Sequence, residues 1–452
     1  TEVIRREVLL VPGDSLDLAR LAENERNLRR LLFLGEPRIA VLPTDDGVEL
    51  RVEVIDLYAR ALAPLVSGEL DALGYGATAM DYNLLGTGQQ VRLTAQHDPV
   101  TGNRYELGHY LPRLGRGPLA ITNSLAVGDE GHDALAEVAH PFRTLEDRQA
   151  WGLQVSSHEE SQRLYAAGEQ SGRYRDRLDN AAAWFTGSWG DRLKIRPTLR
   201  LSLSNRRFDE ATPGTVLPHD RRRFLPAVGL TLWQPRYRQT RFVHALGPLE
   251  DLQTGSWAAV LGGVSARTLG SDRTFAFLQA HLSPRAAVGR GYALASLYAS
   301  GRWSEAGLYH LFLQAEGLAY LRFGAAHSLA LRLRADALHR PEDEAQLLLG
   351  LDQGLRGYAP RQFDGTRRLL ATAEARPTLY RGSRWVLAGA LFAEAGSAWT
   401  PGQTKAEGHG TCGAGVRVGL PQVYHTPVLR GDLAWPWGRR ELQVSVGIGQ
   451  WF

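Results

Sequence analysis

The stretch "LKIRPTLRLSLS", Leu193 to Ser204, indicates the fold class of this chain, because its apolar and polar residues alternate. Apart from Pro197, the odd-numbered positions are aliphatic: Leu193, Ile195, Leu199, Leu201 and Leu203. The even-numbered positions are charged or hydroxylated: Lys194, Arg196, Thr198, Arg200, Ser202 and Ser204. Successive side chains of a β-strand point to opposite faces, so the stretch predicts a strand with one aliphatic and one polar face.

A second stretch, Leu329 to Ala337, repeats the pattern, with Leu331 and Leu333 on one face and Arg332 and Arg334 on the other. Strands of soluble β-sandwiches are usually about five or six residues long, whereas strands that cross a membrane need about 9 to 11. Long strands with an aliphatic face favour a transmembrane barrel with lipid outside and a charged, wet lumen. A β-sandwich core remains the alternative.

Aromatic residues support the membrane interpretation. The chain contains 11 tryptophans and 15 tyrosines. In membrane barrels such residues form girdles at the two membrane interfaces, near the strand ends. The tryptophans expected there are Trp184, Trp189, Trp233, Trp303, Trp385, Trp399, Trp435 and Trp437.

Composition and motifs exclude several classes of protein. The formal net charge is +4, from 52 Lys+Arg and 48 Asp+Glu, which is too even for a polyanion binder. Cys412 is the only cysteine, so an intrachain disulfide and a cysteine-built zinc site are both excluded. No window approaches 18 consecutive apolar residues, and no signal peptide or catalytic motif occurs. We expect neither an enzyme nor a cofactor or metal site.

The first 66 residues follow a different pattern from the rest. Leu18, Leu21 and Leu28 recur at helical spacing, and two alternating segments flank the turn "TDDG", Thr44 to Gly47. We therefore divide the chain into an α+β segment, 1–66, and a barrel, 67–452. At roughly 24 residues per strand and connection, the barrel would contain about 16 antiparallel strands.

The C-terminal stretch "ELQVSVGIGQWF" predicts the last barrel strand. Its small or polar positions are Gln443, Ser445, Gly447 and Gly449. Its apolar positions are Leu442, Val444, Val446, Ile448 and Phe452. The alternation predicts one lipid-facing and one lumen-facing side, with an aromatic residue at the final position.

Five motifs resemble those of a known family. They are "DYNLLGTGQQVRL" (Asp81 to Leu93), "GLRGYAP" (Gly354 to Pro360), "TAEARP" (Thr372 to Pro377), "LFAEAGSAW" (Leu391 to Trp399) and "LRGDLAWPW" (Leu429 to Trp437). In this order they resemble the motifs of the BamA/TamA outer-membrane assembly superfamily. The resemblance implies a sixteen-stranded barrel after a periplasmic POTRA module. In this chain the module lacks its first strand, which suggests that more sequence precedes it.

The resemblance implies a latch in the lumen. Leu355, Arg356, Gly357 and Tyr358 match the tip of a long extracellular loop that folds back into the barrel, with Leu355 in place of the usual β-branched residue. A guanidinium in a narrow lumen needs a carboxylate partner, and we predict Glu394, where the family usually has aspartate. The further latch partners are Phe392, Gly396, Glu374 and Arg376. The alternative is that the motif only stabilises the barrel.

The function implied is insertion of client proteins into the bacterial outer membrane without ATP, with POTRA in the periplasm. POTRA would receive unfolded clients, and the barrel would open between the first strand, within Leu70–Asn83, and the last. Gly447 and Gly449 would weaken that seam, and Phe452 resembles an assembly signal. Partners would be client proteins, outer-membrane lipids and periplasmic proteins or lipoproteins, and no nucleic acid. Alternatives are a two-partner-type secretion pore and a structural barrel in a larger complex.

Overall fold

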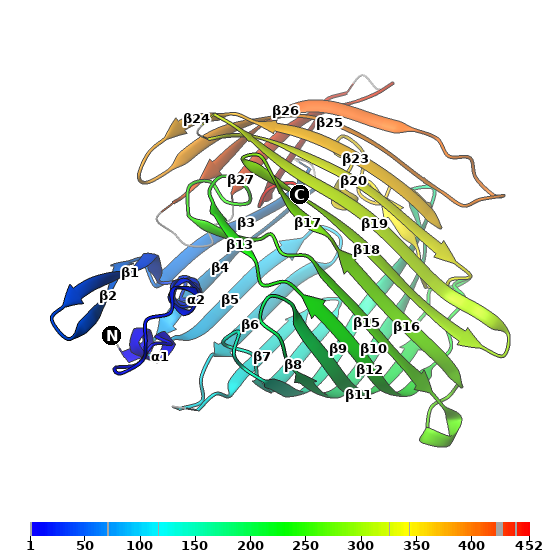
Figure 1. Ribbon diagram of the computed structural model, residues 1–452. Coiled ribbons are helices and arrows are strands. Elements are labelled where there is room, and N and C mark those ends of the chain that lie inside the picture. Colours follow the sequence, from blue (N-terminus) through cyan, green and yellow to red (C-terminus); the bar gives the residue numbers. More distant parts are fainter. Residues whose placement is uncertain are drawn as a thin grey trace.

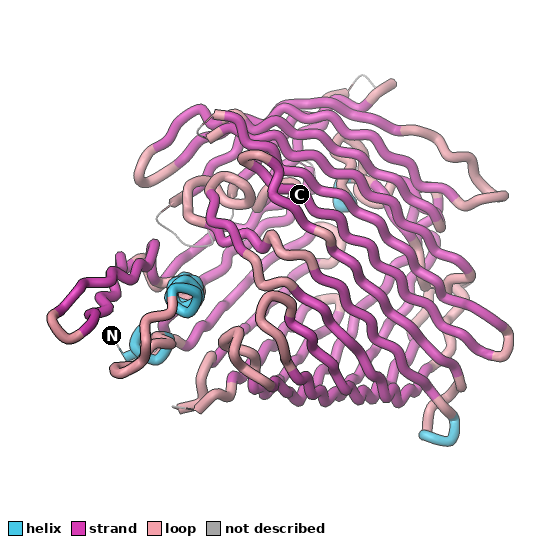
Figure 2. Tube along the Cα trace, viewed as in Figure 1, coloured by secondary structure: helices cyan, strands magenta, loops and turns pink. Residues whose placement is uncertain are grey.

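Most of the chain forms one closed antiparallel β-barrel, with the N-terminal segment at one end (Figure 1). The computed structural model describes residues 2–69, 72–115, 117–324, 326–342, 344–421, 428–438 and 441–452. Below, the end of the barrel that carries the N-terminal segment is called proximal and the opposite end distal. Figure 2 shows a wall of tilted strands, with the described helical residues limited to the N-terminal segment and two single turns.

The N-terminal segment contains two helices and a hairpin. The helices are α1 (Glu2–Glu7) and α2 (Leu18–Arg29), and the carboxylate of Asp17 accepts from the backbone of Ala19 at the start of α2. Among the described residues, neither helix is long and apolar enough to cross a membrane. The hairpin pairs β1 (Leu34–Thr44) with β2 (Gly47–Asp56) in a separate two-stranded sheet.

The barrel wall starts at Arg60 and is a continuous antiparallel ladder that returns to its first strand. The wall segments are β3 (Arg60–Glu69), β4 (Ala72–Leu84), β5 (Gln89–Asp98), β6 (Gly102–Leu111), β7 (Ala120–Gly128), β8 (Gly131–His140), β9 (Gln149–Ala166), β10 (Glu169–Gly187), β11 (Lys194–Asp209), β12 (Arg221–Trp233), β15 (Trp257–Ser265), β16 (Phe275–Ser283), β17 (Arg285–Val288), β18 (Gly291–Ser304), β19 (Gly307–Phe323), β20 (His327–His339), β23 (Arg367–Arg376), β24 (Thr378–Arg381), β25 (Val386–Trp399), β26 (His409–Gly419), β27 (Leu429–Pro436) and β28 (Gln443–Ile448).

The wall has 20 strands, so the prediction of about 16 is wrong. Segments β16 and β17 pair along the same neighbour, β18, and β23 and β24 pair along β25, so each couple counts as one strand. Pro284 and Pro377 occupy the two breaks. Proline has no backbone N–H to donate to the ladder, which explains why the pairing is interrupted there.

Short turns explain the larger strand number. The distal connections β5–β6, β7–β8 and β9–β10 contain only two or three residues, so less sequence is used per strand than expected. The first wall strand is β3, not a strand within Leu70–Asn83, and residues 60–66, expected in the N-terminal segment, belong to it. The motif Asp81 to Leu93 consequently spans the turn between the second and third strands, β4 and β5, rather than the first hairpin.

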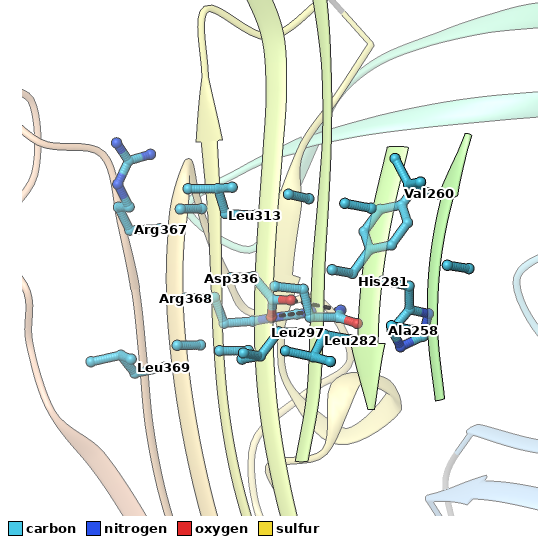
Figure 3. Close-up of a pocket in the computed structure, with 18 of the residues that line it drawn as sticks. Ala258, Val260, His281, Leu282, Leu297, Leu313, Asp336, Arg367, Arg368 and Leu369 are labelled. Carbon is cyan, nitrogen blue, oxygen red and sulfur yellow. Dashed lines mark hydrogen bonds and ion pairs between the residues drawn. The ribbon is translucent and has the colours of Figure 1, made fainter. Parts of the chain in front are cut away.

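The two faces of the wall differ in chemistry as the alternation predicts. On β11, Leu199, Leu201 and Leu203 are exposed on the outside, while Lys194 is buried on the lumen side. Figure 3 shows an apolar groove of about 780 Å³ across neighbouring strands, with Val260, Leu282, Leu297, Leu313 and Leu369 among its lining residues. Asp336 and Arg368, which also border the groove, are hydrogen-bonded to each other.

Two long connections enter the lumen. The first, which we call the latch loop, comprises residues 340–366 between β20 and β23. It contains β21 (Leu347–Leu349), the turn η2 (Leu351–Gln353) and β22 (Phe363–Gly365). The second, which we call the proximal loop, comprises residues 234–256 between β12 and β15, with the short pair β13 (Tyr237–Thr240) and β14 (Glu250–Gln253). A further turn, η1 (Arg267–Leu269), lies in the connection between β15 and β16.

Candidate functional site

The tip of the latch loop is a tight, buried turn that presents Arg356 to the wall. Leu355 is fully buried and packs with Leu349, Tyr358 and Leu370. Gly357 has a φ of +83°, a conformation that side chains with a Cβ rarely adopt. Burial of the apolar neighbours therefore holds the tip inside the barrel.

Glycine is also required at the tip for close packing. A Cβ atom added at Gly357 would lie 3.0 Å from Thr411 Oγ1 and 3.3 Å from Pro436 Cδ. On β25, a Cβ at Gly396 would lie 3.0 Å from Leu349 Cδ2, in the latch loop. Both glycines thus allow the loop and the wall to approach closely.

Arg356 makes its shortest contacts with Glu394 of β25. Its Nε and Nη2 donate to Glu394 Oε1 at 2.9 and 2.7 Å, and its backbone N–H donates to Oε2 at 2.7 Å. Neither charged group is accessible to solvent. A buried guanidinium needs an opposite charge with aligned acceptors, and Glu394 supplies both. The extra methylene of glutamate relative to aspartate is accommodated without loss of these bonds.

Two further carboxylates reach the same guanidinium from other strands. Arg356 Nη1 lies 2.9 Å from Glu374 Oε2 on β23 and 3.3 Å from Asp432 Oδ1 on β27. Neither contact is aligned well enough to satisfy Nη1 as a hydrogen-bond donor, so both are ion pairs without directed bonds. Through one side chain, the latch tip is joined to β23, β25 and β27.

Three more arginines complete the cluster. Arg376 Nε donates to Glu374 Oε1 at 2.8 Å, and Arg417 Nη2 donates to Glu374 Oε2 at 3.2 Å. Arg417 Nη1 and Arg430 Nη1 donate to Asp432 at 2.7 and 3.1 Å. These contacts leave Glu394 as a partner of Arg356, while Arg376 pairs with Glu374 instead of sharing Glu394. The cluster is therefore one network, in which Glu374 and Asp432 each pair with three arginines and Glu394 pairs with Arg356.

Two aromatic rings lie against the Arg356 guanidinium. The Cζ atom lies 3.3 Å from the ring centroid of Phe392 on β25 and 4.6 Å from that of Trp451, near the end of the chain. Arg430 Cζ lies 4.3 Å from the same Trp451 ring. Cation–π contacts of this kind strengthen when water is excluded. The end of the chain is thereby attached to the latch.

Tyr358 fixes the latch tip to β26. Its hydroxyl donates to the carbonyl of Gly410 at 3.0 Å, and its ring packs edge-on against Phe363 and His409.

We predict that Tyr358→Phe lowers the free energy of unfolding by only about 1 kcal/mol, because the Gly410 carbonyl also accepts from the backbone N–H of Trp437 and keeps a partner. Urea unfolding of the purified barrel in lipid vesicles measures this change. A loss above about 3 kcal/mol would show that the hydroxyl has a further buried partner.

A solved barrel with a similar chain path is CdiB from Escherichia coli. It aligns over 99% of this chain and 73% of its own, with a TM-score of 0.50 and 12% sequence identity. The chain has the Omp85 barrel fold. BamA from Haemophilus ducreyi lacking POTRA domains 1–3 aligns over 99% of this chain and 82% of its own, with a TM-score of 0.47 and 13% identity. CdiB from Acinetobacter baumannii aligns over 98% of this chain and 70% of its own, with a TM-score of 0.46 and 12% identity. No protein-family model and no curated protein matches the sequence.

The Omp85 fold confirms the family resemblance inferred from the motifs at the level of the fold. In this fold the closing seam joins β28 to β3. Of the seam residues named from the sequence, Val446 pairs with Gly68 of β3, whereas Val444 and Ile448 lie opposite residues of β27. The seam therefore involves β3, which the sequence pattern did not identify as a barrel strand.

The last residues of this Omp85 fold turn away from the wall. Strand β28 ends at Ile448, and Gly449 has a φ of +92°. Phe452 consequently packs inside, where its ring centroid is 5.3 Å from Arg376 Cζ. A Cβ at Gly447 would lie 2.6 Å from Arg430 Nη2. Gly447 thus makes room for the arginine beside the latch.

Sequence reasoning did not assign Asp432, Arg417, Trp451 and His409 to the latch of this Omp85 fold. Asp432 belongs to the motif Leu429 to Trp437, whose Arg-x-Asp spacing places both charges on the lumen face of one strand. This spacing could have predicted that Asp432 belongs to the latch cluster. The positions of the other three depend on contacts between segments far apart in the chain.

Proposed function

We propose that this chain is an outer-membrane barrel that inserts client proteins through the seam between β3 and β28, without a nucleotide. The Omp85 fold supports a transport role in the bacterial outer membrane. The choice of insertion rests on one observation, the unpaired edge of β3.

The edge is open over most of β3. Between the described residues, the ladder joining β3 to β28 is limited to Glu69–Ser445 and Gly68–Val446. Because β28 ends at Ile448 and the chain then turns inward, residues 60–67 have no ladder partner on this side among the described residues. Unpaired backbone N–H and C=O groups are costly inside a membrane and are a template for another strand.

The N-terminal segment offers a second edge for strand addition. Strand β2 pairs only with β1 among the described residues. Beside it lies a cavity of about 340 Å³, lined by Val48, Leu50 and Val52 of β2 and by Leu10 and Leu16 of the helix connection. An extended client could add its backbone to β2 and place alternate apolar side chains in this cavity. We propose that the segment receives clients in this way, as the resemblance to a POTRA module implies.

The energy for insertion would come from the client. Burial of its aliphatic strand faces in lipid and pairing of its backbone groups are both favourable. The β3 edge would pair with the first client strand, so that no unpaired strand has to enter the lipid alone. ATP is not required for such a process.

Site-specific photocrosslinking tests the route. A photoreactive residue is placed at Leu62, exposed on the outer face of β3, at Leu203, exposed on the outer face of β11, or at Ser202, on the lumen side of β11. We expect newly synthesised β-barrel proteins to be captured at Leu62 and not at Leu203. Capture at Ser202 alone would contradict insertion and favour a secretion pore through the lumen. Capture at none of the positions, with abundances of other outer-membrane barrels unchanged on depletion, would favour a structural role.

A further inference from the structure

The proximal loop is a second segment that enters the lumen, and the latch does not account for it. Residues 234–256 connect β12 to β15 at the proximal end, the end on which β13 and the helices appear in Figure 1. The neighbouring proximal connection between β17 and β18 consists only of Gly289 and Arg290. The proximal loop is therefore far longer than closing two wall strands requires.

The apolar residues of the proximal loop are buried against the opposite part of the wall. Phe242 and Leu246 pack with Val386 and Ala388 of β25 and with Val428, just before β27. The loop therefore crosses the proximal mouth from β12 to β27 instead of lying on its rim.

A second group of contacts joins the proximal loop to three other strands. Val243 and Leu252 pack with Tyr292, Tyr320 and Ala330, which come from β18, β19 and β20. Ala330 is fully buried under them. In addition, Arg376 of the latch cluster donates to the carbonyl of Val243 at 3.5 Å. The loop and the latch thus meet at one arginine inside the lumen.

The crossing segment has a built conformation. The Glu250 carboxylate accepts from the backbone N–H groups of Val243, His244 and Ala245 at 3.2, 3.0 and 3.2 Å. His244 donates to or accepts from the Tyr292 hydroxyl at 3.2 Å. A carboxylate that accepts from three consecutive backbone amides holds a turn in place. These hydrogen bonds give the part of the proximal loop that crosses the mouth a defined conformation.

The base of the proximal loop is bound to the N-terminal segment by a few directed contacts. Arg29 of α2 donates to Asp251 of β14 through Nε at 2.6 Å and Nη2 at 3.0 Å, a bidentate pair. Arg26 Cζ lies 4.2 Å from the Tyr237 ring, and Arg241 pairs with Glu36. A cleft of about 650 Å³ separates α2 from the rest of the loop. Movement of α2 therefore acts on the loop mainly through these contacts.

We propose that the proximal loop is a plug that closes the lumen at its proximal end and that α2 holds it closed through the Arg29–Asp251 pair. The inference concerns regulation of the proposed transport barrel and rests on that function. A client that displaces the N-terminal segment would loosen the plug and, through Val243, the arginine that it shares with the latch cluster.

Accessibility of a cysteine under the plug tests the proposal. The purified chain carries Cys412→Ser and Ala330→Cys, and labelling by a membrane-impermeant maleimide is followed with time. We expect slow labelling with the plug intact and fast labelling when residues 241–249 are replaced by a short Gly-Ser linker. A cysteine at Lys405, on the exposed distal loop, is the control and should label at one rate in all variants. Fast labelling of Ala330→Cys with the plug intact would overturn the closure.

The charge pair tests the control by α2 and does not depend on the shortened loop folding. We expect Arg29→Glu to accelerate labelling of Ala330→Cys about tenfold, since loss of a charge-assisted contact changes an opening equilibrium by about that factor. The exchange Arg29→Glu with Asp251→Arg should restore slow labelling. An unchanged rate in Arg29→Glu, or no rescue by the exchange, would overturn the coupling. Because no client is present, these results are independent of the photocrosslinking that tests insertion.

Discussion

Arg356→Ala is expected to lower the free energy of unfolding by about 3–5 kcal/mol, the cost typical of breaking a buried ion pair. The guanidinium is inaccessible to solvent and contacts three carboxylates that are equally inaccessible: Glu374, Glu394 and Asp432. Its removal leaves Glu394 without a described cationic partner, while the other two keep Arg376, Arg417 and Arg430. Leaving a charge unpaired in a dry site costs more than the lost contacts alone.

Urea unfolding in lipid vesicles measures the change. Arg207→Ala is the matched control, because Arg207 pairs with Asp179 at 3.5 Å and both side chains are about half exposed. Such a pair contributes about 0–1 kcal/mol. The loss of stability in Arg356→Lys should fall between the two, since lysine keeps the charge but cannot donate to Glu394 Oε1 through both Nε and Nη2 as Arg356 does. Equal decreases in the free energy of unfolding for Arg356→Ala and Arg207→Ala would contradict the prediction that the latch stabilises the barrel.

Oxidation of two cysteine thiols to a disulfide across the seam is expected to abolish client insertion. Glu69→Cys on β3 and Ser445→Cys on β28 occupy directly opposed positions in the ladder, in a Cys412→Ser background. If clients enter between these strands, a covalent bond there prevents separation. Reduction should restore insertion to the level of the unoxidised protein. Release of folded β-barrel clients into vesicles, measured by their protease resistance, is the readout.

A disulfide one strand away is the control for the seam. Leu433→Cys and Val444→Cys join β27 to β28 at directly opposed positions, and Val444 is adjacent to Ser445. This bond should leave insertion intact, because β27 and β28 would move together. Full insertion with the seam bond formed would rule out lateral opening and shift the proposal to passage through the lumen. Loss of client insertion with each of the two disulfides would point to a general effect of crosslinking β28.

The alternation of aliphatic and polar residues was sufficient to predict a membrane-type barrel. Strand periodicity is a local property, since successive side chains alternate between the two faces of a strand and the face of a residue can be read from its neighbours in the chain. The same reasoning found the helical spacing of Leu18, Leu21 and Leu28 and the hairpin around Thr44 to Gly47. Strand number was not predictable in this way, because it depends on turn lengths, and the short distal turns left room for 20 strands.

The latch illustrates the same limit at the level of single residues. The motifs led to the prediction that Arg356 pairs with Glu394, and the two residues, 38 positions apart, are hydrogen-bonded in the structure. The ion pairs to Glu374 and Asp432 and the Trp451 ring come from other strands and from the end of the chain. Periodicity identifies the face of each strand, but not which lumen residues meet.

By itself, the sequence determined the barrel class, one N-terminal helix and the hairpin after it, and a charged lumen, because these follow from local periodicity and turn residues. Only the tertiary structure decided the closing strand at Arg60, the inward turn after Ile448 and the plug formed by the proximal loop. Each of these depends on packing between segments distant in the chain, where burial of apolar side chains and pairing of buried charges outweigh local preference.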